Sequence, residues 1–383
     1  MKKFPILFLI AVALASCTAD KDPVSQDSGW EETPPMNEPT SGQAIKMQDG
    51  KILVVGGHDA STKQFTTHGE IYDDNTKTWT NLTGGVAGNT RLYALTNGDI
   101  IAIHSEDGAG SLNVSRLKKG ELAFKTIGQI GILMASGFIP NYNDLLELPD
   151  GTLVITAFNK ITLLKPGSST LELYSDESLG SPRFAGATIL GMSDRKILIM
   201  EDLDEEKGLD GIFRAWDLDL PYSNPIEDFD NQAKHAYYML QKYRINPSTW
   251  LVSGGLNGLN VQLAGSKARL VNVNTGEVTP ADEVIAPVSD PAFETPSGIF
   301  PLSDGRLYIA SQNYQKPYHR IYDPSTKRYA EGDGYLRYNE NGKTLFPEEI
   351  DAYEKGATSI AITGSDEIFI TTAMGRCWIL RKK

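Results

Sequence analysis

Histidine readily serves as a metal ligand or as a general base near neutral pH, and this chain of 383 residues contains five. His58 and His104 each come at the end of a short segment rich in apolar residues, at equivalent points of two successive repeats. The two imidazoles could therefore form a metal pair or supply a base. Neither a His-x-His nor a His-Glu-x-x-His pattern is present, and the spacing dictates no third ligand. Chance placement is therefore the interpretation we favour.

The acidic run from Glu201 to Glu206 is a second candidate for chemistry. Calcium is held by several carboxylate oxygens, so this run could bind it. Its spacing does not fit an EF-hand loop, and runs of like charge are usually solvated. We therefore expect no cofactor and keep calcium as the alternative. Phosphate-binding, dinucleotide-binding and Gly-x-Ser-x-Gly motifs are absent from the sequence.

The composition is that of an ordinary soluble globular protein, with 40% hydrophobic and 22% charged residues. The formal net charge is −13, from 49 acidic and 36 basic residues. A nucleic-acid-binding surface needs cations that displace counterions from phosphate, so this balance argues against a nucleic-acid partner. Two cysteines are too few for a disulfide scaffold or a cysteine-rich zinc site.

The N-terminus has the features of an export signal. Two lysines precede the apolar run 4–15, which is too short to span a membrane and ends in Leu14-Ala15-Ser16-Cys17. This tetrad resembles a bacterial lipobox, in which the cysteine is lipidated and begins the mature protein. The resemblance implies a signal peptide at 1–16, a lipidated Cys17 and a flexible tether over 17–27. It further implies an outer-membrane lipoprotein, facing the periplasm or the cell surface and similar to those of Bacteroidota.

Residues 28–383 repeat a pattern of two apolar runs joined by a tight polar turn. Asp-Gly and Asn-Gly are strong hairpin signals, because both central residues of the turn can adopt positive φ. The turns recur every 44 to 61 residues, and the residues before the second runs are Gly50, Gly98, Gly151, Arg195, Thr249, Gly305 and Asp366. A period of about 50 residues made of strands alone is typical of propeller blades. We therefore predict an all-β, seven-bladed β-propeller of four-stranded antiparallel blades, with apolar layers between the blades.

The first blade resembles the kelch family. An apolar run, Ile52–Val55, leads into Gly56-Gly57, and Tyr72-Asp73 and Trp79 follow in the family's order and spacing. Partial matches are Gly254-Gly255 in the fifth blade and Tyr322-Asp323 in the sixth. The resemblance implies a kelch-type propeller like that of galactose oxidase.

The copper site of galactose oxidase includes a cysteine bonded to a tyrosine. The cysteine that remains here after lipidation is Cys377, in the last expected strand beside Trp378. This is a structural position, so we expect no copper site.

The ring needs a closing strand, because the C-terminus supplies only three strands to the last blade. Residues 28–33 contain Trp30 in a setting like that of Trp79, so we predict that they pair with residues 376–381 and remove an exposed sheet edge. The long acidic segment 208–242 departs from the repeat. We interpret it as an insertion that forms a helical turn or an ordered loop over one face.

In kelch-like propellers, the loops after the second strands and the links between blades line one face around the channel. That layout implies a common mouth for the residues that leave the second strands and enter the first strands. The candidate ligand-binding residues are His58, Arg91, His104, Asn143, Arg183, His235, Asn313 and Tyr314. Their imidazole, guanidinium, amide and phenol groups suit a polar ligand.

The favoured function is recognition of a glycan or protein partner at this mouth by a membrane-anchored lipoprotein, with an adhesin as one form. The alternative is a polysaccharide-active enzyme, either a lyase or a sialic-acid-type enzyme. In a lyase, an arginine would neutralise a uronate, and His104, Tyr142 or His235 would abstract the proton. A third hypothesis is a scaffold within an outer-membrane complex, whose sign would be a large exposed apolar patch.

Overall fold

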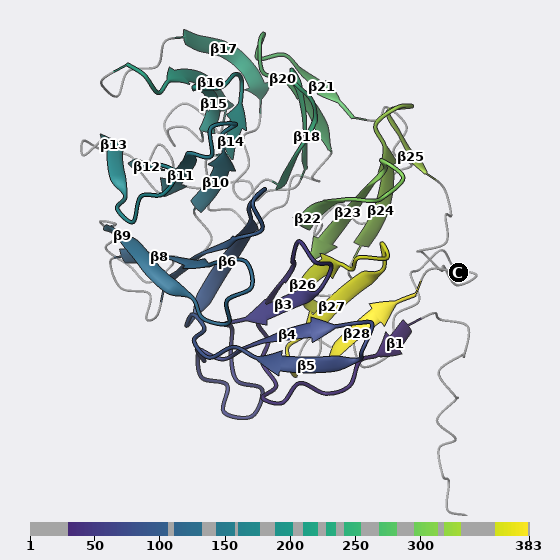
Figure 1. The fold of residues 1–383 in the computed structure, drawn as a ribbon. Coiled ribbons are helices and arrows are strands. Elements are labelled where there is room, and N and C mark those ends of the chain that lie inside the picture. Colours follow the sequence, from purple (N-terminus) through teal and green to yellow (C-terminus); the bar gives the residue numbers. More distant parts are fainter. Residues whose placement is uncertain are drawn as a thin grey trace, which may run out of the picture.

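The computed structural model describes residues 30–105, 111–131, 143–157, 160–176, 188–201, 210–220, 227–234, 241–253, 268–281, 295–312, 318–330 and 357–381. Their strands form seven four-stranded antiparallel sheets, arranged as blades in a ring (Figure 1). The predicted seven-bladed β-propeller is therefore confirmed. The described residues contain no helix that is long and apolar enough to cross a membrane.

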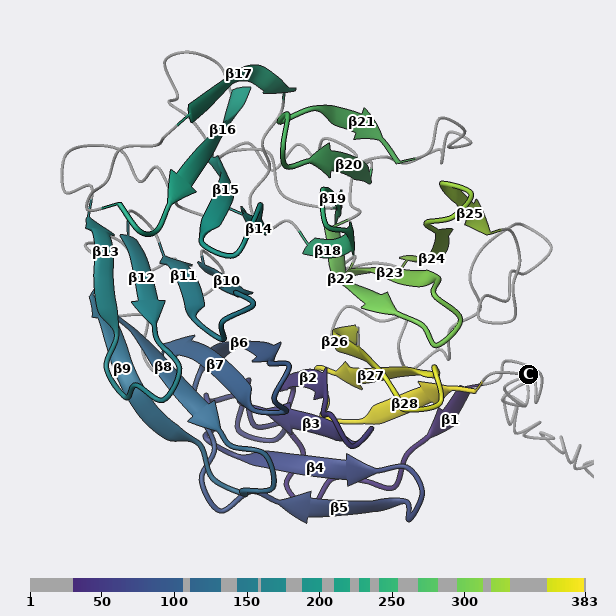
Figure 2. The same cartoon turned by 45° about the horizontal axis from the view of Figure 1, so that its top comes forward.

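Each blade is a meander whose first strand lies nearest the axis of the ring (Figure 2). The inner strands are β2 (Gln43–Lys46), β6 (Asn89–Ala94), β10 (Asn143–Glu147), β14 (Thr188–Gly191), β18 (Gln241–Asn246), β22 (Thr295–Pro301) and β26 (Ala357–Ile362). The second strands are β3 (Ile52–Val55), β7 (Ile100–Ser105), β11 (Leu153–Ala157), β15 (Lys196–Glu201), β19 (Thr249–Ser253), β23 (Leu307–Gln312) and β27 (Ile368–Thr372). The third strands are β4 (Gly69–Asp73), β8 (Ser111–Leu117), β12 (Lys160–Leu164), β16 (Asp210–Asp217), β20 (Arg269–Asn272), β24 (Tyr318–Asp323) and β28 (Cys377–Leu380). The outer strands are β5 (Thr78–Asn81), β9 (Lys125–Gly131), β13 (Glu172–Asp176), β17 (Glu227–Lys234), β21 (Val278–Pro280), β25 (Arg328–Ala330) and β1 (Trp30–Glu32).

The second strands carry much of the core. β3, β7, β11 and β27 are buried along their whole length and are rich in β-branched residues, which pack well on a pleated sheet. Side chains of neighbouring blades meet between the sheets. The rings of Tyr72 in β4 and Phe369 in β27, for example, lie 5.9 Å apart. The core therefore consists of apolar layers between the blades, as the sequence pattern predicts.

The hairpins between first and second strands are present, but their turns differ from the expected type. In blade one, Met47 N donates to Lys51 O at 2.8 Å, and Gly50 N donates to Met47 O at 3.0 Å. Gly50 has a φ of 86°, whereas Asp49 has no positive φ. The expectation that both central residues adopt positive φ is therefore wrong, because the loop has three residues and a single left-handed position. In blade seven, Asp366 occupies that position with a φ of 62°.

The ring is closed as the sequence predicts. β1 pairs with β28 in antiparallel register, with Trp30 opposite Leu380 and Glu32 opposite Trp378. The guanidinium of Arg376 reinforces this pairing with two hydrogen bonds to the Glu32 carboxylate, at 2.5 and 2.6 Å. Both ends of the propeller therefore belong to one blade.

The segment 208–242 is not an insertion. It contains β16 and β17, the third and outer strands of blade four, with Lys196 opposite Asp217 and Arg214 opposite Asp228. An outer strand has one solvent-facing side and needs no continuous apolar run, so the acidic composition of β17 concealed it in the sequence.

Candidate ligand-binding site

The strand register brings the starts of the inner strands and the ends of the second strands to one end of the propeller. Asn89 lies opposite Ser105, and Asn143 lies opposite Ala157. The other five blades have the same arrangement. The inner strands surround the axis (Figure 2), so their first residues form a circle at this end, which we call the inner-strand rim. This is the predicted mouth.

The rim is rich in amides and hydroxyls. In six of the seven blades the inner strand begins with such a residue: Gln43, Asn89, Asn143, Thr188, Gln241 and Thr295. Blade seven begins with Ala357, and Thr358 and Ser359 follow. Amide and hydroxyl groups both donate and accept hydrogen bonds. Asn143 and Thr188 are buried, whereas the side chains of Gln43 and Gln241 are partly exposed and can meet a polar ligand.

The predicted residues Arg91 and Asn143 meet at the rim, between blades two and three. The Nη1 of Arg91 donates to the Asn143 carbonyl oxygen at 2.5 Å. Tyr93, two residues further along β6, donates from its hydroxyl to the Asn143 Oδ1 at 3.0 Å. The guanidinium carbon of Arg91 lies 5.5 Å from the centre of the Tyr93 ring, within the range of a cation–π contact. These contacts fix the half-buried guanidinium in one place.

A buried ion pair lies beside this group. Lys242, from β18 of blade five, donates from Nζ to Asp144 Oδ2 at 2.5 Å and to the Ile189 carbonyl oxygen at 2.7 Å. Asp144 also accepts hydrogen bonds from the backbone N–H groups of Ile189 and Leu145, both at 2.9 Å. Lys242 thus joins blades three, four and five. Burial lowers the pKa of Lys242, and the Asp144 carboxylate opposes that shift.

The rim cluster of Arg91, Tyr93, Asp144 and Lys242 carries a net positive charge. It contains two cations, Arg91 and Lys242, and one carboxylate, Asp144, which pairs with Lys242. Burial raises the pKa of Tyr93 well above its usual range, so that the phenol stays neutral. Because its net charge is positive, the cluster can bind an anionic group, although the chain as a whole is acidic.

The predicted histidines lie at the same end of the propeller but do not belong to the rim cluster. His58, in the loop after β3, stacks on Phe65 with ring centroids 4.4 Å apart. His104 is only 4% exposed, and its Nε2 lies 3.0 Å from the Ser115 hydroxyl of the same blade. Of the other candidate residues, Cys17, Tyr142, Arg183, His235, Asn313 and Tyr314 lie outside the described residues.

The sequence analysis missed Tyr93, Asp144 and Lys242. All three are polar residues in inner strands, which lie next to the axis. The second strands β3 and β7, in contrast, are buried along their whole length. A polar interruption of an inner strand was therefore the available signal. The pairing of Lys242 with Asp144 skips blade four, and no sequence spacing indicates such a contact.

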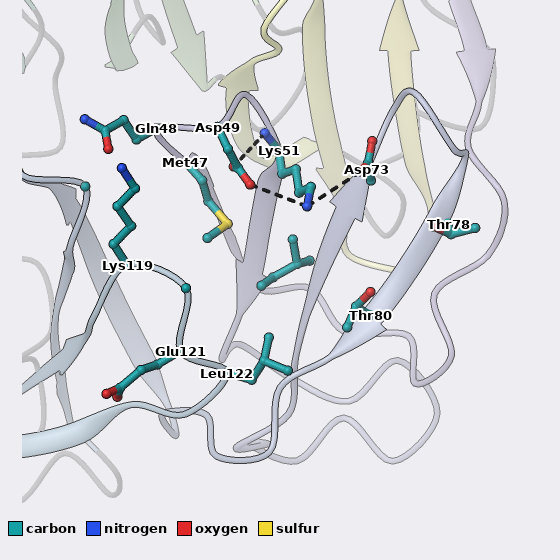
Figure 3. Close-up of a pocket in the computed structure, with 13 residues that line it drawn as sticks. Met47, Gln48, Asp49, Lys51, Asp73, Thr78, Thr80, Lys119, Glu121 and Leu122 are labelled. Carbon is teal, nitrogen blue, oxygen red and sulfur yellow. Dashed lines mark hydrogen bonds and ion pairs between the residues drawn. The ribbon is translucent and has the colours of Figure 1, made fainter.

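A separate groove lies at the opposite end of the propeller, between the hairpin turns of blades one and two (Figure 3). Its volume is about 300 Å³, and Met47, Ile71 and Leu122 form its apolar lining. Lys51 lies 3.4 Å from Asp49 and 3.7 Å from Asp73. These three charged side chains are partly exposed, and the two carboxylates more than balance the lysine, unlike in the rim cluster.

The copper site of galactose oxidase includes a cysteine, and the cysteine considered for such a site here is Cys377. Cys377 is 2% exposed in β28, the third strand of blade seven, and burial raises the pKa of its thiol. It therefore lies in the apolar layer with Tyr72 and Phe369 rather than at the rim. Among the described residues no group of three His, Cys, Asp or Glu side chains is placed to hold a metal ion. Of the acidic run, residues 202–206 lie outside the described residues.

Comparisons with known proteins agree with this architecture. The kelch motif matches residues 41–85, which contain β2 to β5 of blade one. The chain is similar to a fungal alcohol oxidase of the AA5 family in complex with copper, with a TM-score of 0.61 and 11% identity over 91% of this chain and 75% of that chain. It is also similar to a streptogramin B lyase, with a TM-score of 0.54 and 14% identity over 92% of this chain and 97% of that chain. Comparison with curated proteins finds no match. The chain therefore carries a kelch motif in its first blade and shares the propeller fold of both structures.

Proposed function

We propose that this chain is an exported, lipid-anchored receptor that binds a glycan or a protein partner at the inner-strand rim. The observation that carries the proposal is Arg91. Its guanidinium is held in place by Asn143 and Tyr93, and no carboxylate among the described residues forms an ion pair with it. An oriented, unmatched cation at the end of a propeller is a typical anchor for a polar ligand.

The kelch motif supports a binding role, because propellers that carry it commonly bind protein partners. The composition of the rim supports a glycan equally well, since sugars present many hydroxyls. Recognition by a rigid ring also fits the physical design of the site. Its groups sit on strands, which orient them without the entropic cost of ordering a loop on binding.

Export and anchoring are proposed from the N-terminal sequence and are tested by lipid labelling. In a Bacteroidota host fed an alkyne-labelled fatty acid, the full chain should take up the label and partition into detergent. Cys17→Ala should abolish both. The matched control Cys377→Ala changes the buried thiol and should leave the label in place. Labelling of the Cys17→Ala protein would contradict the proposal.

Binding is tested with the soluble fragment 28–383 on a glycan array and in pull-downs from outer membranes. Arg91→Gln should weaken the interaction with whatever partner is found. The matched control is Arg195→Gln, because Arg195 lies in a turn at the opposite end of the propeller and is already paired with Asp150 and Asp219. Equal binding by the two variants and the parent fragment would contradict a site at the rim.

The catalytic alternative requires a base close to Arg91. Tyr93 is a poor base, because burial raises its pKa. His104 lies on the strand paired with that of Arg91, but it is only 4% exposed and contacts Ser115. Any glycan that binds should nevertheless be checked for cleavage. Turnover would replace the receptor proposal with that of a polysaccharide-active enzyme.

A further inference from the structure

The charges of the rim cluster define the ligand more narrowly. We propose that the rim binds an acidic sugar of the uronic- or sialic-acid type, whose carboxylate pairs with Arg91. This inference rests on the proposed receptor function and specifies its ligand. Three features of the site support it: the free donors of Arg91, the partners of Asp144 and the partly exposed amides of the rim.

The guanidinium of Arg91 retains most of its hydrogen-bonding capacity. An arginine has five N–H donors in a planar fork, and contacts with described residues use one of them, at the Asn143 carbonyl oxygen. The fork matches the two oxygens of a carboxylate, which gives a bidentate, charge-assisted pair. A neutral ligand would leave this charge uncompensated in a half-buried position, so the site discriminates in favour of an anion.

Asp144 directly follows Asn143 in the chain, but both of its oxygens already accept hydrogen bonds. Oδ2 accepts hydrogen bonds from Lys242 at 2.5 Å and from Ile189 N at 2.9 Å, and Oδ1 accepts one from Leu145 N at 2.9 Å. Lys242 therefore has a definite role in recognition: it neutralises Asp144 and keeps the charge of Arg91 available to the ligand. It is a positioning residue and need not touch the sugar.

The remainder of the rim favours a sugar over a simple carboxylic acid. Gln43 and Gln241 begin two other inner strands at the same end of the ring as Arg91, and both side chains are partly exposed. Such groups pair with the hydroxyls of a pyranose, each of which both donates and accepts. A single carboxylate on a hydroxylated ring therefore satisfies both parts of the site.

The test uses an array of uronic- and sialic-acid glycans, each printed beside its carboxyl-reduced neutral form, with fragment 28–383 as the probe. We expect binding to acidic glycans and at least about tenfold weaker binding to their neutral forms, the range of one charge-assisted pair. Arg91→Gln should lose this preference. Lys119→Gln, which removes a cation from the groove at the opposite end, should retain it.

The role of Lys242 is tested by charge compensation. Lys242→Met releases Asp144 to neutralise Arg91 and should weaken acidic-glycan binding about tenfold. The double variant Lys242→Met with Asp144→Asn restores the net charge of the cluster and should bind within about threefold of the parent. A merely structural role would not give this rescue. If the single variant fails to fold, Asp144→Asn alone remains informative, since it should bind the acidic glycan at least as tightly as the parent.

Each outcome separates this inference from the receptor function. Equal binding of acidic and neutral glycans, or failure of the double variant to bind, would overturn the acidic-sugar inference and leave the receptor proposal standing. Capture of a protein partner through Arg91 without any glycan binding would have the same effect. Absence of every partner, with no effect of Arg91→Gln, would overturn both.

Discussion

Two regions of the propeller use arginine to join distant strands, and they differ in how the charge is matched. At the ring closure, Arg381 forms hydrogen bonds of 2.6 Å to three carboxylates. Its partners are Glu31, Asp74 and Glu367. At the inner-strand rim, Arg91 donates to the backbone oxygen of Asn143 and has no carboxylate partner among the described residues.

The difference indicates separate roles for the two arginines. Three carboxylates more than neutralise the charge of Arg381. Its hydrogen bonds join β1, blade one and blade seven, so its role is to stabilise the fold. Arg91 is held by one hydrogen bond and a cation–π contact, and under the proposed function its charge is left for the ligand. Asp144 is a carboxylate of the same rim cluster, but it accepts its hydrogen bond from Lys242. At the closure, carboxylates neutralise the arginine, whereas the arginine of the candidate site has no carboxylate partner among the described residues.

The largest expected effect is that of Lys242→Met on stability. Removal of one partner from a buried ion pair leaves Asp144 uncompensated, which costs about 3–5 kcal/mol of unfolding free energy. Urea denaturation of fragment 28–383 measures this loss. The matched control is Lys196→Met, which breaks a 4.0 Å exposed pair with Asp217 and should cost less than about 1 kcal/mol. Similar losses for both lysines would show that the rim pair is not buried in solution.

The next effect is that of Arg381→Met on the ring closure. Loss of a half-buried arginine with three carboxylate partners should lower the unfolding free energy by about 1–3 kcal/mol. The same substitution should leave ligand binding at the rim unchanged. A variant that keeps its stability but loses binding would reverse the roles assigned to the two arginines.

Acid should weaken the closure in a predictable pH range. Burial alone would raise the pKa of Asp74, but hydrogen bonds from Arg381 and Lys77 hold it at about 2, below its ordinary value of 3.8. A lowered folded-state pKa contributes stability above the unfolded-state value, and this is lost as the pH falls through the folded-state value. After allowance for solvent screening, we expect a loss of about 1 kcal/mol between pH 4 and pH 2. Denaturation curves of Asp74→Asn should lack this component.

The smallest effects are expected in the groove between blades one and two. Lys51 is 40% exposed and lies within 4 Å of two partly exposed carboxylates. Lys51→Met should therefore change the unfolding free energy by less than about 1 kcal/mol. Ligand binding should not change either. A substantial loss of binding by this variant would move the site from the rim to the groove shown in Figure 3.

The sequence was most informative where contacts are local or follow from the repeat. The turn at Gly50 and its equivalents set the hairpins, and a missing fourth strand in the last blade predicted the pairing of Trp30 with the C-terminal strand. The acidic outer strand β17 escaped prediction, because it has no apolar alternation. At the site, Arg91 and Asn143 could be predicted from the layout of the blades. The bond between Asp144 and Lys242 could not, since it spans 98 residues and skips a blade.

The most direct test of the account is the affinity of an acidic glycan, set against that of its carboxyl-reduced form, for two variants of fragment 28–383. The variants are Arg91→Gln and Arg381→Gln. We predict that Arg91→Gln loses the preference for the acidic form and keeps its stability to within about 1 kcal/mol. Arg381→Gln should lose stability and keep the preference. An undiminished preference in Arg91→Gln would contradict the claim that its unmatched charge recognises the ligand.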